Sequence, residues 1–271
     1  MADRGVTEPR VALVTGAARG IGAATVAQLC ADGYRVVAVD IAGIDGRAEG
    51  IEYELSTWAD LEAVADQYPD SVIPVAADVR DRKALQAAAD LAIEQWGRLD
   101  AAVAAAAVII GGKPLWETPG EHLQTLLDID VVGVWNTAAA VVPHMLRGPN
   151  PQGCRFVAVA SAAGSTGLFR LAGYNAAKHA VVGLVKGLAA DLVGTGVTAV
   201  AVSPGSTDTP MLQATADLYG LESVAEFIAS SPIRRLLRPE ELAETIVFCC
   251  SLTGGVLNGS VVSATGGFNG G

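Results

Sequence analysis

The chain has 271 residues, 51% hydrophobic and 17% charged, which suits a globular domain with a sizeable core and excludes disorder and low complexity. Eighteen basic against 29 acidic residues give a net charge of −11, so no basic surface is expected to attract nucleic acid or anionic lipid. The longest apolar run, 101–110, is too short to span a bilayer, and the first ten residues lack an apolar signal core. We therefore expect a soluble cytoplasmic chain with no nucleic-acid or membrane partner.

The four cysteines are scattered along the chain, at Cys30, Cys154, Cys249 and Cys250. They form no CxxC pair, and no histidine lies near them at metal-ligand spacing, so the sequence predicts neither disulfides nor a zinc site. We expect four inert, mostly buried thiols and no bound metal.

Seven apolar segments of strand length alternate with segments of helix length, an order typical of parallel strands joined by crossover helices. The expected strands are 11–15, 35–40, 72–78, 101–106, 155–161, 197–203 and 260–264, and the clearest helices are 21–32, 83–96, 121–147, 174–194 and 239–251. Because the strands are apolar on both faces, helices should cover both sides of the sheet. The sequence therefore predicts an α/β fold: a Rossmann-like, doubly wound, seven-stranded parallel sheet in a single domain, 1–271.

Three local features add detail to the predicted fold. Pro74 cannot donate a ladder hydrogen bond, so the third strand should lie at a sheet edge, as in the order 3-2-1-4-5-6. Thr57 and Asp60 have the spacing of a helix capping box. The connection between the second and third strands is longer than a short helix and two loops require, so we infer an insertion at about 41–56 and interpret it as loop.

A glycine-rich turn, TGAARGIG at 15–22, connects the first strand directly to a helix. This arrangement places free backbone N–H groups and the positive end of the helix where a pyrophosphate can bind. We assign dinucleotide contacts to Gly16, Arg19, Gly20, Ile21 and Gly22. The alternative is a tight turn that binds nothing.

Two carboxylates follow the second and third strands at the same edge of the expected sheet. Asp40 lies 18 residues after Gly22, where a carboxylate accepts hydrogen bonds from ribose hydroxyls and repels a 2′-phosphate, which favours NAD over NADP. Arg19 could pair with that phosphate, although a solvated arginine is the preferred interpretation. Asp78 either accepts from the adenine amino group or caps its own loop.

Tyr174 and Lys178 are four residues apart at the start of a helix, so both side chains project from one face. A tyrosine with a pKa of about 10 is a poor acid or base at neutral pH unless a positive charge stabilises its phenolate. Lys178 can supply that charge, and Ser161 ends the preceding strand. An ordinary helix with an exposed tyrosine and lysine is the alternative.

The sequence resembles the short-chain dehydrogenase/reductase family over residues 10–268. The resemblance is carried by TGAARGIG at 15–22, by Ser161 with YNAAK at 174–178, and by PGSTDTPM at 204–211. It implies hydride transfer between a nicotinamide and a carbonyl or alcohol carbon.

The resemblance also implies roles for individual residues. Tyr174 would be the general acid/base, Ser161 would hold the substrate oxygen, and Lys178 would bind the nicotinamide ribose and lower the pKa of Tyr174. Pro204 and Gly205 would line the nicotinamide, and Thr209 would meet its carboxamide. The implied cofactor contacts outside the glycine turn are Asp40, Asp78, Val79, Ala105, Ala106, Tyr174, Lys178, Pro204, Gly205, Thr207 and Thr209.

Two positions depart from the family pattern. Alanines occupy 104–107, where the family usually has NNAG, so side-chain hydrogen bonds near the adenosine ribose are lost. Asp130 stands where the family usually has an asparagine that supports a water relay to the lysine. An aspartate keeps the acceptor and loses the donor, and its charge should hold Lys178 protonated.

The long segment after Asp40, GGKPLWETP at 111–119 and the GGF ending are similar to a narrower branch, the mycofactocin-coupled dehydrogenases. That resemblance implies a tightly held NAD that is reoxidised in place by mycofactocin, with the insertion at 41–56 as a lid. A surface loop without effect on exchange is the alternative, which leaves an ordinary NAD-exchanging dehydrogenase.

The segment at about 206–232 is rich in apolar residues and is expected to cover the cleft, so we expect an apolar alcohol or ketone as substrate. The covering residues would be Met211, Leu212, Leu218, Tyr219, Leu221, Phe227 and Ile228, facing Trp116, Leu168 and Phe169; core packing is the alternative for most of them.

The helix at 174–194 is apolar almost all round, which predicts packing against a second subunit, and the family is commonly tetrameric. A catalytically idle NAD-binding sensor or scaffold is the competing function, kept open by Asp130 and the four alanines.

Overall fold

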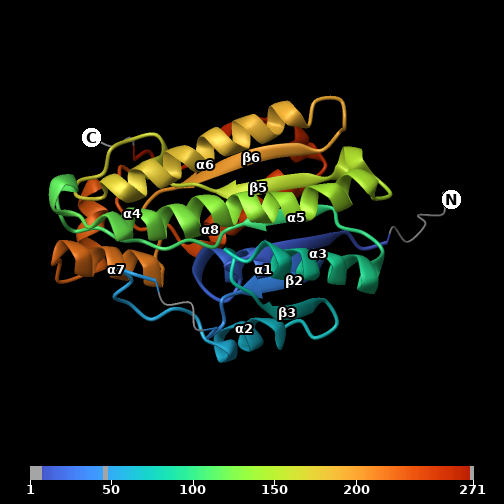
Figure 1. Ribbon diagram of the computed structural model, residues 1–271, viewed down its shortest axis with the longest axis horizontal. Helices are drawn as coiled ribbons and strands as arrows, with labels where there is room; N and C mark the ends of the chain where they lie inside the picture. Colours follow the sequence, from blue (N-terminus) through green and yellow to red (C-terminus); the bar gives the residue numbers. More distant parts are fainter. Residues whose placement is uncertain (1–7, 45–47, 269–271) are drawn as a thin grey trace.

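The computed structural model describes residues 8–44 and 48–268, and its centre is a seven-stranded parallel sheet in the order β3-β2-β1-β4-β5-β6-β7 (Figure 1). The strands are β1 (Val11–Thr15), β2 (Arg35–Asp40), β3 (Val72–Ala76), β4 (Ala101–Ala104), β5 (Arg155–Val159), β6 (Thr198–Pro204) and β7 (Val261–Ala264). The predicted fold class and strand order are confirmed. Pro74 lies on β3 at the sheet edge, opposite Ala38, as its missing N–H requires.

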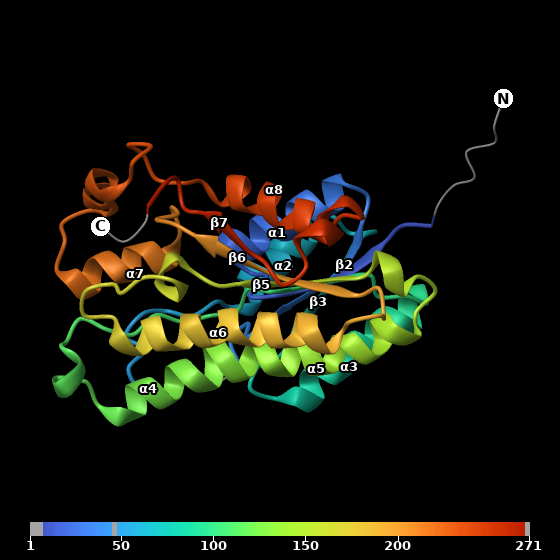
Figure 2. The ribbon, with the colours of Figure 1, turned by 90° about the horizontal axis from the view of Figure 1, so that it is seen from above.

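Helices cover both faces of the sheet, as expected (Figure 2). One layer holds α1 (Gly20–Ala31), α2 (Trp58–Ala65) and α8 (Pro239–Cys250); the other holds α3 (Arg82–Trp96), α5 (Gly133–Arg147) and α6 (Ala172–Asp191). Near one end lie α4 (Gly120–Leu126) and α7 (Pro210–Tyr219). The shorter turns are η1 (Leu115–Glu117), η2 (Leu127–Val132), η3 (Pro151–Gly153), η4 (Ala162–Gly164), η5 (Val224–Ser230) and η6 (Thr253–Leu257).

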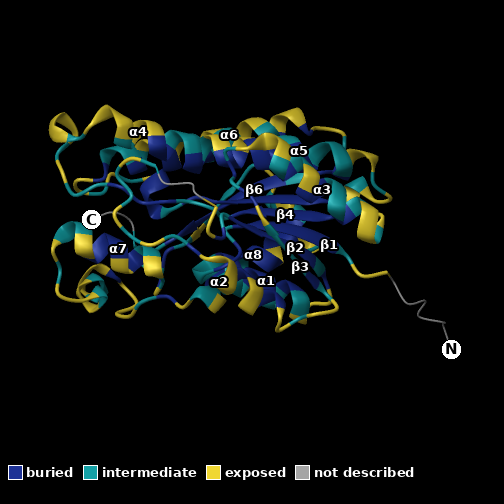
Figure 3. Ribbon diagram, turned by 60° about the horizontal axis from the view of Figure 1, so that its bottom comes forward, coloured by how far each residue is buried: buried dark blue, intermediate teal, exposed yellow. Residues whose placement is uncertain are grey.

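The core consists of two layers of side chains that the sheet separates. Successive strand residues point to opposite faces, so Leu13 belongs to the core under α3, α5 and α6, and its neighbour Val14 to the core under α1 and α8. The central strands are buried, the two edge strands β3 and β7 are partly exposed, and most other exposed residues lie on the outer faces of the helices and in the loops (Figure 3). This two-sided burial explains why the strands read as continuous apolar runs.

Several predicted boundaries are wrong near the carboxyl ends of the strands. The third, fourth and fifth strands were expected to end at 78, 106 and 161, but they end at 76, 104 and 159. The remaining residues of each run leave the ladder and line the cavity described below. These residues are small or polar, and they form the wall of the cavity instead of pairing with a neighbouring strand.

The helix expected at 121–147 is interrupted. It consists of α4, a π-helical segment at Leu127–Val132 and α5, because one extra residue per turn is accommodated in the middle. The whole stretch Gly120–Arg147 is long and apolar enough to cross a bilayer, but 61% of its most apolar window is buried within the protein, as in the core helix of a soluble protein. The π-helical segment carries Asp130.

The capping box of α2 is confirmed. Thr57 Oγ1 accepts a hydrogen bond from Asp60 N at 3.3 Å, and Asp60 Oδ2 accepts one from Thr57 N at 2.7 Å. Both satisfy backbone donors that a helix start otherwise leaves free.

Replacing Thr57→Ala should therefore lower the free energy of unfolding by about 1 kcal/mol, a typical value for the loss of an N-cap side chain. Urea denaturation at fixed protein concentration measures this change. Thr57→Ser keeps the hydroxyl and serves as the control, which should stay near the wild type. Equal losses in both variants would show that the cap contributes nothing.

Candidate active site

A cavity of about 520 Å³ opens at the carboxyl ends of the strands. Its wall brings together segments far apart in the sequence: the glycine turn before α1, the ends of β2 to β6, the start of α6, and α7. All the predicted site residues except Asp130 line this cavity. The lining set includes Gly16, Arg19, Gly20, Ile21, Gly22, Asp40, Asp78, Val79, Ala105, Ala106, Ser161, Tyr174, Lys178, Pro204, Gly205, Thr207 and Thr209.

The glycine turn has the shape of an anion cradle. Gly16 has a φ of +68°, and a Cβ built there would come within 2.6 Å of the Ala106 backbone nitrogen. A Cβ on Gly22 would lie 1.9 Å from the carbonyl oxygen of Gly16, so both positions require glycine. No side chain among the described residues caps the N-terminus of α1, and its first N–H groups are available to a phosphate. This donor set fits the pyrophosphate of a dinucleotide.

Asp40 lies in the cavity wall at the end of β2. Its Oδ2 accepts a hydrogen bond from Ala18 N at 2.9 Å, and its Oδ1 accepts one from Ser56 Oγ. A carboxylate has about four acceptor positions, so two remain for the hydroxyls of a ribose. The two protein bonds hold the carboxylate in a fixed orientation.

The interpretation of Arg19 as a solvated side chain is wrong. Its guanidinium pairs with Asp60 at 2.7 Å and donates to the carbonyl oxygens of Leu55 and Glu54 at 2.9 and 3.2 Å. These partners lie in the inserted segment and in α2, which sequence spacing does not place next to the glycine turn. The guanidinium is therefore already neutralised, which weakens its use as a partner for a 2′-phosphate.

Asp78 makes the contacts of a loop cap. Its Oδ1 accepts from Arg80 N at 2.8 Å, and the Arg80 guanidinium pairs with its Oδ2 at 2.5 Å. Burial disfavours the charged form, but the hydrogen bonds and charge of Arg80 outweigh it and lower the pKa of Asp78. The carboxylate still borders the cavity, so an adenine contact remains compatible with this arrangement.

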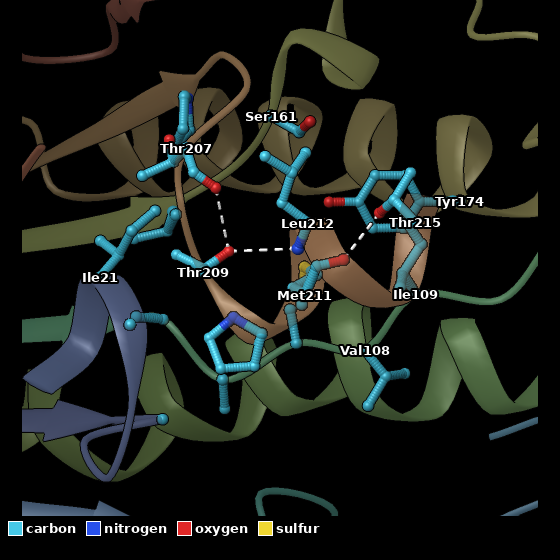
Figure 4. A pocket seen from close by; sticks show the side chains of 18 of the residues that line it. Ile21, Val108, Ile109, Ser161, Tyr174, Thr207, Thr209, Met211, Leu212 and Thr215 are labelled. Atoms are coloured by element: carbon cyan, nitrogen blue, oxygen red, sulfur yellow. Dashed lines mark hydrogen bonds between the residues drawn. The ribbon is translucent and has the colours of Figure 1, made fainter. Parts of the chain in front are cut away.

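The three residues proposed for chemistry meet in the cavity. Tyr174 and Lys178 lie in the first turns of α6, with Lys178 Nζ 5.5 Å from the centre of the Tyr174 ring. Ser161 follows β5 and lies in the same cavity wall as Tyr174 (Figure 4), and hydrogen bonding from its side chain lowers the pKa of the phenol. The tyrosine and lysine are 6% and 2% exposed, so the alternative of an exposed pair on an ordinary helix is wrong.

Asp130 lies behind the lysine and forms a buried ion pair with it. The distance from Asp130 Oδ2 to Lys178 Nζ is 3.3 Å, and Asp130 Oδ1 accepts a hydrogen bond from Val108 N at 2.8 Å. Lys178 Nζ also donates to the carbonyl oxygen of Val159 at 3.4 Å. Although burial opposes its charge, the adjacent carboxylate raises the pKa of Lys178, so the lysine is held protonated as expected.

Lys178 lowers the pKa of Tyr174, as the resemblance implies, but the net direction of the shift is upward. Burial raises the pKa of Tyr174, and Asp130 adds to the increase, while Lys178 and the hydrogen bond from Ser161 lower it. The raising influences prevail because burial is the largest of them, and Asp130 offsets part of the effect of Lys178. An aspartate in place of the usual asparagine thus makes this tyrosine a weaker acid.

The loop after β6 positions the opposite wall. Thr209 Oγ1 donates to the Thr207 carbonyl oxygen at 3.2 Å and accepts from Leu212 N at 3.2 Å, and so caps α7 (Figure 4). Its methyl group lies against the glycine turn, 3.1 Å from where a Cβ of Gly20 would be. The threonine therefore joins the two halves of the cavity.

The expected apolar cover is confirmed only in part. Six of the named residues line the cavity, namely Leu168, Phe169, Met211, Leu212, Tyr219 and Phe227. Trp116 is 81% exposed and lies outside the described residues that line the cavity, so the expectation that it faces the cleft is wrong. Leu218 packs against the core instead, as the alternative allowed.

Five residues of the insertion line the cavity and were not found from the sequence: Ile41, Tyr53, Glu54, Leu55 and Ser56. The segment Ile-Glu-Tyr-Glu-Leu at 51–55 alternates apolar and acidic residues, a signal of one buried face that the interpretation as plain loop overlooked. Three residues of the insertion, 45–47, lie outside the described residues.

The four cysteines are free, and burial raises the pKa of Cys30, Cys154 and Cys249 to about 11 and that of Cys250 to about 12. They are therefore unreactive thiols at neutral pH. Within the described residues, no cluster of His, Cys, Asp or Glu could hold a metal ion.

Comparisons with known proteins agree with this geometry. A short-chain dehydrogenase family model, described as enoyl-(acyl carrier protein) reductase, matches residues 16–269. The chain is 36% identical to (-)-trans-carveol dehydrogenase of Rhodococcus erythropolis over 209 residues, covering 76% of this chain and 74% of that protein. It is 34% identical to cis-4-hydroxycyclohexanecarboxylate dehydrogenase of Sinomonas cyclohexanicum, with 96% of each chain covered.

Among solved structures, carveol dehydrogenase from Mycobacterium avium in complex with NAD is similar, with a TM-score of 0.86, 30% identity, and 96% and 98% of the two chains covered. The cavity and these matches define a dinucleotide-dependent oxidoreductase. The chain belongs to the short-chain dehydrogenase/reductase family, and it is an NAD-dependent enzyme acting on CH–OH and C=O groups.

Replacing Asp130→Asn should move the pH profile of alcohol oxidation to lower pH. With Tyr174 as the expected base, the rate of alcohol oxidation should rise with pH through the pKa of that tyrosine, and Asp130 contributes to keeping this pKa high. Without the carboxylate, the midpoint of kcat/KM against pH should fall. Asp128→Asn, in the same π-helical segment, should leave the midpoint in place; an unchanged or higher midpoint in Asp130→Asn would contradict the assignment.

Proposed function

We propose that this enzyme oxidises an apolar secondary alcohol to a ketone, with Tyr174, Ser161 and Lys178 acting on the substrate and NAD held along the glycine turn. The single observation that supports this most directly is the convergence of the three polar side chains in a cavity whose remaining wall is largely apolar. The named substrates of the two curated relatives are alcohols, which agrees with the proposal.

In the proposed mechanism the hydroxyl of Ser161 holds the substrate oxygen, and Tyr174 in its phenolate form takes the proton of the alcohol. Lys178 stabilises the phenolate and binds the nicotinamide ribose, while Asp130 keeps the lysine charged and oriented. NAD, when bound, would supply the acceptor for the hydride that leaves the alcohol carbon. The apolar side chains of Leu168, Met211 and Leu212 exclude water from the reacting carbon.

The remaining cofactor contacts are proposed from their positions in the cavity wall. The glycine turn would hold the pyrophosphate and Asp40 the adenosine ribose. Asp78 and Val79 would border the adenine, while Ala105 and Ala106 would lie near the adenosine ribose. The nicotinamide half would meet Pro204, Gly205, Thr207 and Thr209.

Tyr174→Phe should reduce turnover by about 10²- to 10⁴-fold, because only the ionisable hydroxyl is removed. NAD affinity should stay nearly unchanged, since the ring and the ion pair of Lys178 remain. Steady-state kinetics and NAD titration by fluorescence measure the two effects. Retention of more than a tenth of the wild-type rate would reject Tyr174 as the acid/base.

We further propose that NAD stays bound between turnovers and is reoxidised in place by mycofactocin. The inserted segment supports this: Leu55 and Glu54 bind Arg19 of the glycine turn, and Ser56 binds Asp40, so the segment lies over the adenosine half of the cavity. An ordinary exchanging dehydrogenase is the second candidate. An idle NAD-binding scaffold is disfavoured, because the complete set of Ser161, Tyr174 and Lys178 has no use in binding alone.

With an apolar secondary alcohol, the purified enzyme should show a single-turnover burst, followed by continued turnover only when an artificial electron acceptor or mycofactocin is added. Absorbance at 340 nm and mass spectrometry of released nucleotide follow the bound cofactor. Shortening 41–56 to a tight loop should convert the enzyme toward exchange with free NAD. Rapid exchange of labelled NAD into the wild type, with full turnover on free NAD alone, would leave the ordinary dehydrogenase as the function.

We propose a cytoplasmic homotetramer of single-domain subunits. In support, α5 and the adjacent π-helical segment expose large apolar side chains, with Trp135 60% and Val132 42% exposed. The outer face of α6 carries small residues, including Gly183 and Gly187, which would allow close approach of a second helix. These surfaces would pack against their copies in a partner subunit.

A further inference from the structure

The second half of the insertion forms an extended strap, which we define as residues 50–56. It leads into α2, and its beginning extends towards the end of the molecule that carries α4 and α7 (Figure 1). Ile51, Tyr53 and Leu55 pack against the core below α3, α5 and α6, while Glu52 and Glu54 are exposed. At its beginning, Gly50 lies against the ring of His122 in α4; a Cβ there would come within 2.7 Å of it.

The strap is attached at both sides of the cavity. On the adenosine side, Ser56 binds Asp40, and the carbonyl oxygens of the two preceding residues accept from Arg19. On the substrate side, the Tyr53 hydroxyl accepts a hydrogen bond from Ile109 N at 2.9 Å. Since the strap forms no strand ladder, side chains and isolated carbonyls supply these attachments.

The partner of Tyr53 belongs to the loop that holds the counter-ion of the lysine. Two successive N–H groups of this loop are bound from different directions: Val108 N donates to Asp130 and Ile109 N donates to Tyr53. Asp130 in turn pairs with Lys178. The phenol of Tyr53 therefore connects the strap to the wall of the chemical site, and it lines the same cavity as Tyr174.

We propose that Tyr53 is a positioning residue that latches the strap across the cavity and slows the release of NAD. The proposal rests on the proposed retention of NAD. The hydrogen bond to Ile109 N is the attachment on the far side of the cavity from the adenosine contacts, so its loss frees the strap at one side only. Dissociation of a dinucleotide lying beneath the strap requires that this side opens.

Tyr53→Phe removes the hydroxyl and keeps the ring in its packing. We expect NAD to dissociate about 3- to 10-fold faster, the effect of losing one hydrogen bond of ordinary strength. Where release limits the steady state, kcat on free NAD should rise by a similar factor. A loss of structural integrity would lower kcat instead, so a rise separates the latch from a merely structural role.

The measurement starts with enzyme loaded with NAD and follows its replacement by excess isotopically labelled NAD. Two controls match the change: Tyr34→Phe removes a phenol that donates to the Cys250 carbonyl oxygen at 3.2 Å, away from the strap and the cavity, and Glu52→Gln alters an exposed residue on the strap. Both should release NAD at the wild-type rate. A wild-type rate in Tyr53→Phe, or equal acceleration in either control, would overturn the latch.

The outcome for the proposed function is read separately, from the wild type alone. If wild-type NAD exchanges within a turnover, the retention of NAD fails, whatever Tyr53 does. If the wild type retains NAD and Tyr53→Phe retains it equally, retention stands and the latch fails. If the wild type exchanges quickly and the variant more quickly still, the latch stands without retention.

Discussion

The parallel direction of the seven strands is the constraint on which the rest of the structure depends. Because every strand ends at the same edge, the glycine turn after β1, the carboxylate at the end of β2, the serine after β5 and the loop after β6 all reach one cavity. Gly16 and Phe268, which are 252 positions apart in the sequence, thus share one wall. Crossover helices on both faces make this placement possible, since each returns the chain to the sheet in the same direction.

The two buried charges in the site, those of Lys178 and Asp130, stabilise each other. Lys178 and Asp130 are 2% and 0% exposed, and neither could hold its charge in such surroundings without the other. Asp130 Oδ2 has no hydrogen-bond partner among the described residues, so the ion pair is its main stabilisation. An asparagine at this position would leave the full charge of the lysine to act on Tyr174. With an aspartate there, the ionisation of Tyr174 depends more on the pH and on the charge of any molecule bound in the cavity.

The insertion spans one edge of the cavity, with contacts on both sides of it. Its contacts reach the glycine turn, the end of β2 and the loop after β4, three places that a dinucleotide would also touch. This segment is held mostly by side-chain contacts and has no backbone pairing with a strand, so its opening costs less free energy than the opening of a strand. Such a segment can move when the cofactor has to leave. Under the proposed retention of NAD, opening the strap would require the loss of only a few hydrogen bonds.

Local chemistry was enough to determine the order of strands and helices, the edge position of Pro74, the capping box of Thr57 and Asp60, the glycine turn, and the shared helix face of Tyr174 and Lys178. Each of these depends on residues within a few positions of one another, or on a missing N–H, so the sequence contains the whole cause. Tertiary structure alone decided the pairing of Arg19 with Asp60, the π-helical turn that presents Asp130, the exposure of Trp116, and the contact of Tyr53 with Ile109. Arg19 and Asp60 are 41 positions apart in the sequence, and Tyr53 and Ile109 are 56 positions apart. Contacts between residues so far apart in the sequence form only when the whole chain packs around the sheet.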